Sequence, residues 1–256
     1  MPAPTFPHFP PAGSPTAMHT PPAILFDLDD TLVAFDAVSA PAWAQVTHAH
    51  AAHIGIQAST LLEAIDARNR WYWSDPERHR LGRHNLPHTR RQLVHAALAE
   101  LGHRDEARNH ALADAYTALR TELMHLLPGA HALLTALRSR GTRLGLVTNG
   151  TAAEQRQKID RFALAPHFDF IQVEGELGMG KPEDGAYRHA LARIGTPAHL
   201  TWFVGDNLEW DVRAPQRHGM TGVWVDRNGD ADPPPPQPHH RVRDLRELGG
   251  LLGIEI

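Results

Sequence analysis

The sequence predicts an α/β fold, in which a doubly wound, Rossmann-like parallel sheet carries an inserted all-helical cap domain. Three observations support this prediction. Short apolar runs alternate with helical patterns along most of the chain. The runs are continuously apolar, which is typical of strands covered by helices on both faces. Finally, residues 32–142 contain helical patterns and no strand pattern, which is too long a stretch for an ordinary crossover between parallel strands.

The predicted strands share an apolar run that ends at polar residues, and they are residues 23–26, 143–147, 168–173, 201–204 and 222–225. Helical patterns separate the later strands, at residues 152–164, 183–194 and 209–218. Apolar side chains at helical spacing predict four helices inside the insertion, at residues 42–53, 60–73, 89–101 and 104–127. A further helix at residues 130–140 returns the chain to the sheet. Alternation of strand and helix favours right-handed crossovers in one sheet.

These elements divide the chain into an α/β core of residues 23–32 and 128–256 and a helical cap domain of residues 33–127. Residues 1–22 hold eight prolines and few aliphatic side chains, so we expect a disordered tail, and Met18 is an alternative start. The proline-rich residues 232–238 predict a loop, because proline donates no backbone hydrogen bond and fixes φ.

Composition excludes several classes of function. The chain has 256 residues, with 25 Lys and Arg against 29 Asp and Glu, so no basic excess favours nucleic acid or an anionic membrane as partner. Cysteine is absent, which excludes disulfides, cysteine nucleophiles and thiolate metal sites. No apolar run is long enough to span a bilayer, and prolines interrupt every apolar stretch before Ala23. We therefore expect a cytoplasmic protein without nucleic-acid or membrane partners.

Chemically capable side chains follow the predicted strands. In open α/β sheets, ligands bind beyond the carboxyl ends of the strands, and these residues lie there. Each by itself is typical of a helix cap, a turn or an exposed loop. Acids, a hydroxyl and a lysine together at one sheet edge indicate a site instead. The candidates are Asp27, Asp29, Thr148, Asn149, Lys181, Asp206 and Asp211.

Four motifs occur in order: Phe26-Asp-Leu-Asp-Asp-Thr-Leu32, Val147-Thr-Asn-Gly150, Gly180-Lys-Pro182 and Val204-Gly-Asp-Asn-Leu-Glu-Trp-Asp211. On these motifs the chain, over about residues 24–225, resembles the haloacid dehalogenase-like hydrolase superfamily, in its phosphatase branch with a helical cap inserted after the first strand. One departure is visible. A proline common two residues after the Lys181-Pro182 pair is absent, and Glu183-Asp-Gly185 stands there.

The resemblance implies a phosphomonoester hydrolase that uses Mg²⁺ and acts on a small phosphorylated metabolite. Asp27 is then the nucleophile that forms an aspartyl-phosphate. Asp27, Asp206 and the backbone carbonyl of Asp29 are the implied Mg²⁺ ligands, with Asp211 acting through water or by holding the loop geometry.

The resemblance also implies roles for the remaining residues. Asp29 protonates the leaving oxygen and then takes a proton from the hydrolytic water. Thr148 and the Asn149 amide bind the phosphoryl oxygens. Lys181 stabilises developing charge and keeps Asp27 in place.

Three alternatives stay open. Haloacid dehalogenases of the same superfamily lack a second carboxylate at the position of Asp29 and need no Mg²⁺. Receiver-type signalling domains accept a phosphoryl group on aspartate, but they lack a long helical insertion, and their lysine follows all the acids, whereas Asp206 follows Lys181 here. A non-catalytic, phospho-accepting or binding member of the family is the third. Because every expected catalytic position is filled, the phosphatase is favoured.

The sequence does not decide among nucleotides, sugar phosphates, phosphoglycolate-like acids and phosphorylated cofactors, nor between monomer and homodimer. An aromatic and arginine-rich group in the insertion is a candidate for substrate contact, although packing between cap and core is the preferred interpretation. This group comprises Trp43, Arg68, Arg70, Trp71, Tyr72 and Trp73.

Overall fold

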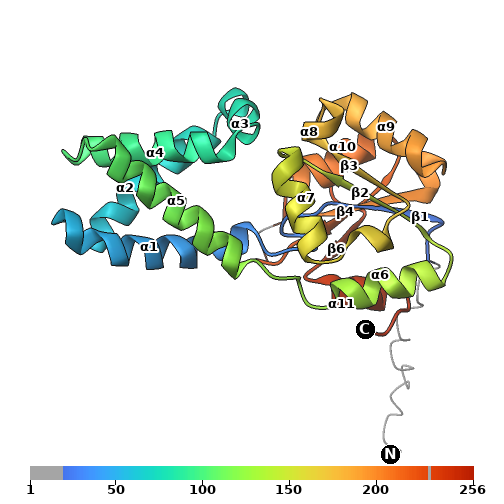
Figure 1. Cartoon of the computed structure of the whole chain (residues 1–256). Helices are drawn as coiled ribbons and strands as arrows, with labels where there is room; N and C mark the ends of the chain where they lie inside the picture. Colours follow the sequence, from blue (N-terminus) through green and yellow to red (C-terminus); the bar gives the residue numbers. More distant parts are fainter. Residues whose placement is uncertain (1–19, 230–231) are drawn as a thin grey trace, which may run out of the picture.

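Six parallel strands form one sheet in the computed structural model, which describes residues 20–229 and 232–256 (Figure 1). The strands are β1 (Ala23–Phe26), β2 (Arg143–Thr148), β3 (Phe170–Val173), β4 (Thr201–Gly205), β5 (Thr221–Val225) and β6 (His240–Val242). Their order is β3-β2-β1-β4-β5-β6, and every neighbouring pair is parallel. The central strand β1 lies between β2 and β4, so the strand order reverses there and the carboxyl end of β1 faces the crevice.

Helices cover both faces of the sheet, which confirms the predicted doubly wound fold. They are α6 (Ala130–Ser139), α7 (Ala152–Arg161), α8 (Glu174–Leu177), α9 (Asp184–Ile194), α10 (Ala214–Arg217) and α11 (Leu245–Leu251). Side chains of β1 alternate between the two layers. Ile24 and Phe26 pack in the cluster that contains residues of α6, α7 and α11, whereas Leu25 packs with residues of α9 and α10. Because both faces are buried, every residue of this strand is apolar.

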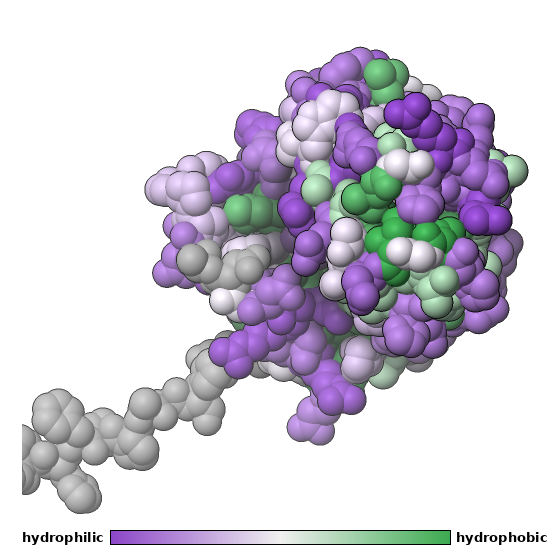
Figure 2. Space-filling model, turned by 90° about the vertical axis from the view of Figure 1, so that its left-hand side faces the viewer, coloured by the Kyte–Doolittle hydropathy of each residue, from purple (hydrophilic) through white to green (hydrophobic). Residues whose placement is uncertain are grey.

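The long insertion after β1 forms a separate group of helices, here named the helical bundle (residues 39–123; Figure 1). Its helices are α1 (Ser39–Ile54), α2 (Ala58–Trp73), α3 (Pro76–Arg83), α4 (Leu86–Glu100) and α5 (Glu106–Leu123), preceded by the 3-10 turn η1 (Asp36–Val38). The bundle has its own apolar core, in which residues such as Leu61, Ile65 and Val94 are fully buried. The side of the molecule on which the bundle lies is mostly hydrophilic, with hydrophobic residues gathered over part of it (Figure 2).

Two strand-like connections join the bundle to the sheet. The Ala34 amide donates to the carbonyl of His125 (2.9 Å), and the Leu127 amide donates to the carbonyl of Leu32 (2.8 Å). The segments entering and leaving the bundle are therefore hydrogen-bonded side by side, which brings the bundle next to the carboxyl end of β1.

All five predicted strands are present, with ends that differ by up to two residues, but three short helices, one short strand and the 3-10 turns were not predicted. Helix α3 has little apolar periodicity and depends on local signals: Pro76 is its first residue, and the Asp75 carboxylate accepts from the Arg78 amide (2.8 Å). Strand β6 has three residues, two of them polar, and α8 and α11 are only a few residues longer.

Predicted helices also differ in detail, most of them by two to four residues at one end. The helix predicted at residues 209–218 is the π-helix η4 (Leu208–Arg213) followed by α10, and helix α5 ends at Leu123 instead of residue 127. Residues 232–238 form a loop, as predicted.

Most of the expected N-terminal tail, together with Met18, lies outside the described residues. At its described end, the Pro22 carbonyl accepts from the Arg143 amide (2.9 Å). Among the described helices, none combines the length and the apolar character that a bilayer crossing requires.

Candidate active site

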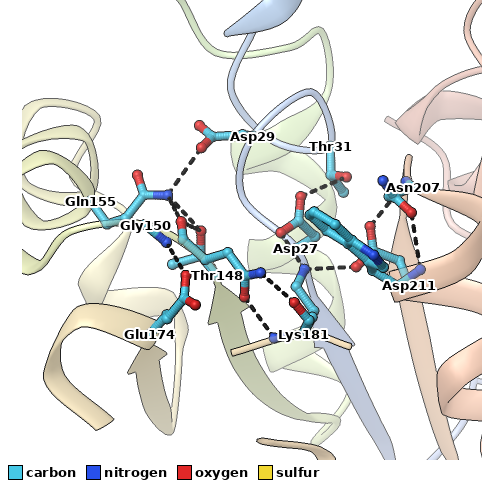
Figure 3. Close-up of polar contacts among 12 residues, drawn as sticks. Asp27, Asp29, Thr31, Thr148, Gly150, Gln155, Glu174, Lys181, Asn207 and Asp211 are labelled. Atoms are coloured by element: carbon cyan, nitrogen blue, oxygen red, sulfur yellow. Dashed lines mark hydrogen bonds and ion pairs between the residues drawn. The ribbon is translucent and has the colours of Figure 1, made fainter. Parts of the chain in front are cut away.

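The carboxyl edge of the sheet brings together residues that are far apart in the sequence (Figure 3). Asp27 follows β1, Thr148 ends β2, and Asp206 follows β4. Lys181 comes from the loop before α9, and Asp211 lies in η4. All five line one cavity, which indicates a single site at the switch point of the sheet.

A buried lysine joins two of the carboxylates. The Lys181 ammonium lies 2.6 Å from Oδ1 of Asp27 and 2.7 Å from Oδ1 of Asp211, and its side chain is 2% exposed. Burial alone would lower the pKa of Lys181, but the carboxylates of Asp211 and Asp27 raise it above its usual range. Lys181 is therefore a permanent positive charge that fixes Asp27 in place.

A third carboxylate completes an acidic cluster. Carboxylate oxygens of Asp27, Asp206 and Asp211 lie within 4.8 Å of one another. Burial, reinforced by the charges of Asp27 and Asp211, raises the pKa of Asp206 to about 9. Burial also raises the pKa of Asp27 to about 7, although Lys181 opposes the shift. These raised pKa values show that one lysine does not compensate the three close carboxylates when all of them are ionised.

This donor set fits a hard divalent cation. The Asp206 carboxylate makes no hydrogen bond or ion pair within residues 20–229 and 232–256, so its oxygens are available as ligands. Mg²⁺ prefers carboxylate oxygens and combines one or two of them with water and substrate phosphate. A divalent cation would supply the missing positive charge between Asp27, Asp206 and Asp211.

Local structure holds Asp211 in the cluster. Asn207 caps the start of η4, and its side-chain oxygen accepts from the amides of Glu209 (3.1 Å) and Trp210 (3.0 Å). The Asn207 amide in turn donates to Oδ2 of Asp211 (3.0 Å). A Cβ on Gly205 would lie 2.3 Å from the Asp211 carboxylate, so only glycine leaves room for this approach.

Thr148 and Asn149 play different parts in the geometry. The Thr148 hydroxyl is buried and accepts from Nε2 of Gln155 (2.9 Å). The Asn149 side chain binds the main chain of Lys181 twice, through Nδ2 to the carbonyl (2.6 Å) and through Oδ1 from the amide (2.8 Å). The structure therefore shows the Asn149 side chain orienting the lysine loop.

Asp29 points away from Asp27, toward helix α7 (Figure 3). Both of its carboxylate oxygens lie 2.7 Å from the Lys158 ammonium, and Oδ2 also accepts from Nε2 of Gln155 (3.0 Å). Sequence reasoning missed Gln155 and Lys158. Their signal is polar side chains three residues apart, on the face of α7 that also carries the buried Ile159.

A third missed residue is Glu174, at the start of α8. Its carboxylate is 1% exposed, accepts from the Gly150 amide (2.9 Å) and forms an ion pair with Arg83 of the bundle (2.7 Å). A contact between two segments 91 positions apart leaves no signal in the sequence.

The cavity has a volume of about 900 Å³ and is lined by both the sheet edge and the helical bundle. Of the aromatic and arginine residues suggested for substrate contact, Trp43, Arg70 and Trp73 line the cavity. Arg68, Trp71 and Tyr72 are absent from its lining. Trp43 stacks on Tyr116 with ring centres 3.7 Å apart, so it also packs within the bundle.

Comparisons with known proteins agree with this geometry. A family model described as haloacid dehalogenase-like hydrolase matches residues 21–219. A phosphoserine phosphatase of Thermus thermophilus is 39% identical over 159 residues, which is 62% of this chain and 63% of the relative, so the chain spans just under two thirds of its length. The pyrimidine 5'-nucleotidase YjjG of Escherichia coli is 28% identical over 90% of this chain and 96% of its own.

Solved structures of related proteins share this fold. The HAD-hydrolase YfnB of Bacillus subtilis, described as bound to magnesium, superposes with a TM-score of 0.71 at 25% identity, over 91% of this chain and 98% of that one. A 2-haloacid dehalogenase of Pseudomonas syringae gives a TM-score of 0.60 at 26% identity, over 92% and 99%.

Proposed function

The chain belongs to the haloacid dehalogenase-like hydrolases, and we propose that it is a magnesium-dependent phosphatase that hydrolyses a small phosphorylated metabolite. The observation that carries this proposal is the position of Asp27. Its carboxylate is buried at the switch point, held by Lys181 and close to the carboxylate of Asp206. The alpha/beta core of residues 23–32 and 128–256 supplies these groups, and residues 33–127 act as the cap domain over them.

Asp27 is the proposed nucleophile. Its carboxylate oxygen attacks phosphorus, the bond from phosphorus to the leaving oxygen breaks, and an aspartyl-phosphate forms, which water then hydrolyses. A carboxylate and a phosphoryl charge repel by about 4 kcal/mol per unit-charge pair at 4 Å and an effective dielectric of 20. Lys181, fixed 2.6 Å from Asp27, offsets part of this repulsion without reorganising.

The proposed Mg²⁺ ligands are the side chains of Asp27 and Asp206 and the backbone carbonyl of Asp29. Asp211 either binds the ion through a water molecule or holds the geometry of the loop. The bound cation supplies positive charge for the phosphoryl oxygens. Thr148 and the main-chain amide of Asn149 are the proposed hydrogen-bond donors to those oxygens. The Asn149 side chain, by holding the Lys181 main chain, keeps the lysine aligned with them.

Asp29 is the proposed acid and base. It first gives a proton to the leaving oxygen and then takes one from the hydrolytic water. For this role its carboxylate has to leave Lys158 and turn toward the reacting centre. A halide leaving group would need no proton, so the carboxyl group at this position favours the phosphatase over the dehalogenase.

The test is release of phosphate from p-nitrophenyl phosphate by the purified full-length chain. We expect turnover with Mg²⁺, none after treatment with EDTA, and recovery on adding Mg²⁺ back. Asp27→Asn, which preserves size, should lower kcat by at least about 10⁴-fold while leaving the circular dichroism spectrum unchanged. Full activity of Asp27→Asn, or chloride release from 2-chloropropionate in place of phosphate release, would overturn the proposal.

A further inference from the structure

Two buried arginines of the helical bundle have no ion-pair partner in the part of the chain that the structure describes, whereas buried arginines are usually paired with a carboxylate. Arg90 of α4 and Arg120 of α5 are each 7% exposed, and both line the cavity that contains Asp27 and Lys181. Within residues 20–229 and 232–256, neither guanidinium forms an ion pair. Arg83, a third buried arginine of the same cavity, shows the ordinary arrangement, because it is paired with Glu174.

Of the two, Arg120 has fewer hydrogen-bond partners. Its Nε is buried without a hydrogen-bond partner, and no side-chain nitrogen of Arg120 donates a hydrogen bond within the described part of the chain. The guanidinium instead lies over two rings, 3.9 Å from the centre of Phe35 and 5.4 Å from the centre of Tyr116. Ring faces attract a cation but accept none of its five hydrogen bonds fully.

Arg90 adds a second positive charge to the part of the cavity wall that Arg120 and Tyr116 form. It donates one hydrogen bond, from Nη1 to the Thr117 hydroxyl (2.7 Å), and lies 5.1 Å from the centre of the Tyr116 ring. Burial and the charge of Arg120 lower the pKa of Arg90 to about 10. Glu154 and Asp36 also line the cavity and attract Arg90, and the charge of Arg120 acts on Asp36, but neither carboxylate forms an ion pair with either arginine among the described residues.

Tyr116, which lies beside both guanidiniums, is held in place by its neighbours. Tyr116 stacks on Trp43 at 3.7 Å with an angle of 10° between the rings, and its hydroxyl shares a hydrogen bond with Ser39 (2.7 Å). A rigid ring therefore carries both guanidiniums. Arg120 is also near the proposed acid, since it and the Lys158 ammonium both lie within 4 Å of the Phe35 ring centre, and Lys158 binds Asp29.

We propose that Arg90 and Arg120 bind a second anionic group of the substrate, which makes the substrate a small phosphate ester that also carries a carboxylate or a second phosphate. This inference rests on the proposed function for the phosphoryl end of the substrate. An anion between the two guanidiniums supplies the acceptors that they lack and removes their mutual repulsion. The planar guanidinium suits carboxylate and phosphate equally, so matched ligands must separate the two.

Binding tests the proposal without turnover. Full-length Asp27→Asn is titrated calorimetrically with 3-phosphoglycerate and with glycerol 3-phosphate, which differ by a carboxylate, and with fructose 1,6-bisphosphate and fructose 6-phosphate, which differ by a phosphate. We expect the member with the second anion to bind at least about tenfold more tightly in one of the pairs. Adding Arg120→Met or Arg90→Gln should remove that preference. Equal affinities within both pairs would overturn the proposal.

Kinetics separate this inference from the proposed function. In the otherwise native chain, Arg120→Met and Arg90→Gln should raise KM for the preferred substrate with a second anionic group by about 10- to 100-fold. For p-nitrophenyl phosphate, which has no second anionic group, kcat/KM should stay within about twofold. Arg91→Gln is the matched control, because Arg91 is the next residue of α4 and is exposed and paired with Asp114. Absence of p-nitrophenyl phosphate hydrolysis contradicts the proposed function, whereas equal losses on all substrates contradict the anion site.

Stability distinguishes a ligand site from a packing role. Arg120→Met keeps the length of the side chain and removes a buried, unpaired charge, so we expect Tm to stay the same or rise while the preference for the second anion is lost. A fall in Tm together with unchanged ligand preference would show that Arg120 only packs.

Discussion

The guanidinium of Arg83, in α3 of the helical bundle, and the carboxylate of Glu174, at the start of α8, form a buried ion pair across 91 positions of sequence. Arg83 is 9% exposed and Glu174 1%, with 2.7 Å between Nη2 and Oε1. The Glu174 carboxylate also accepts from the Gly150 amide, beside Thr148 and Asn149. One carboxylate therefore connects the bundle to the loop that follows β2.

Removing one partner of this pair should destabilise the protein. Arg83→Met leaves the Glu174 charge buried without its cation, and we expect a loss of about 3 kcal/mol in the free energy of unfolding, measured by urea denaturation. Arg80→Met is the control on the same helix, because Arg80 pairs with Glu77 at the surface, and its loss of stability should be much smaller. Similar losses for both variants would show that the buried ion pair contributes no more to the free energy of unfolding than the surface pair does.

Asp29→Asn should separate the two chemical steps. p-Nitrophenolate leaves without a proton, so aspartyl-phosphate formation should survive, whereas its hydrolysis loses the base and should slow by about 10²- to 10⁴-fold. Stopped-flow absorbance should then show a burst of p-nitrophenolate followed by slow turnover. Asp66→Asn, a carboxylate of the same cavity on α2, serves as control and should show neither effect. Unchanged steady-state rates in Asp29→Asn would contradict the assigned role.

Gly205→Ala should damage the proposed metal site, because Gly205 directly precedes Asp206 and lies against Asp211. The added Cβ would lie 2.3 Å from the Asp211 carboxylate, which must move away from Lys181. We expect at least about a tenfold rise in the Mg²⁺ concentration needed for half-maximal activity, as for other residues that orient metal ligands. Gly250→Ala, in α11 with no atom within 4 Å of the new Cβ, should leave the Mg²⁺ requirement unchanged. The same Mg²⁺ dependence in both variants would refute the argument.

Without metal, the acidic cluster should make stability fall as pH rises. Burial raises the pKa of Asp27 to about 7 and of Asp206 to about 9, above the value near 4 of an exposed carboxyl group. Between about pH 4 and 9 the folded protein therefore binds more protons than the unfolded chain, and a rise in pH favours unfolding.

Thermal melts in EDTA at pH 5.5, 7 and 8.5 measure this effect. Asp206→Asn removes one of the shifted groups, so its Tm should fall less over this range than that of the native chain, and the difference isolates Asp206 from the 19 histidines. Mg²⁺ should raise the native Tm more at pH 8.5 than at pH 5.5, because protons compete for the same oxygens. Parallel Tm curves for the two proteins would contradict the assignment.

The sequence by itself determined the architecture and the main chemical groups. Continuous apolar runs such as residues 23–26 and 201–204 specify strands buried on both faces, and parallel pairing then brings the residues after them to one edge. For this reason the sequence could predict that Asp27, Lys181 and Asp206 lie in one site. Short or polar elements such as α3 and β6 could not be found, because their stability comes from capping and from pairing with neighbours.

The tertiary structure alone decided how the side chains are partnered. The attachment of Asp29 to Lys158, the pairing of Arg83 with Glu174 and, among the described residues, the absence of an ion pair at Arg90 and Arg120 all depend on contacts between segments distant in sequence. Whether a buried charge is paired depends on the position of atoms within a few ångströms. Periodicity and spacing describe one segment at a time, so only the packed chain shows which charges are compensated and which remain available for a ligand.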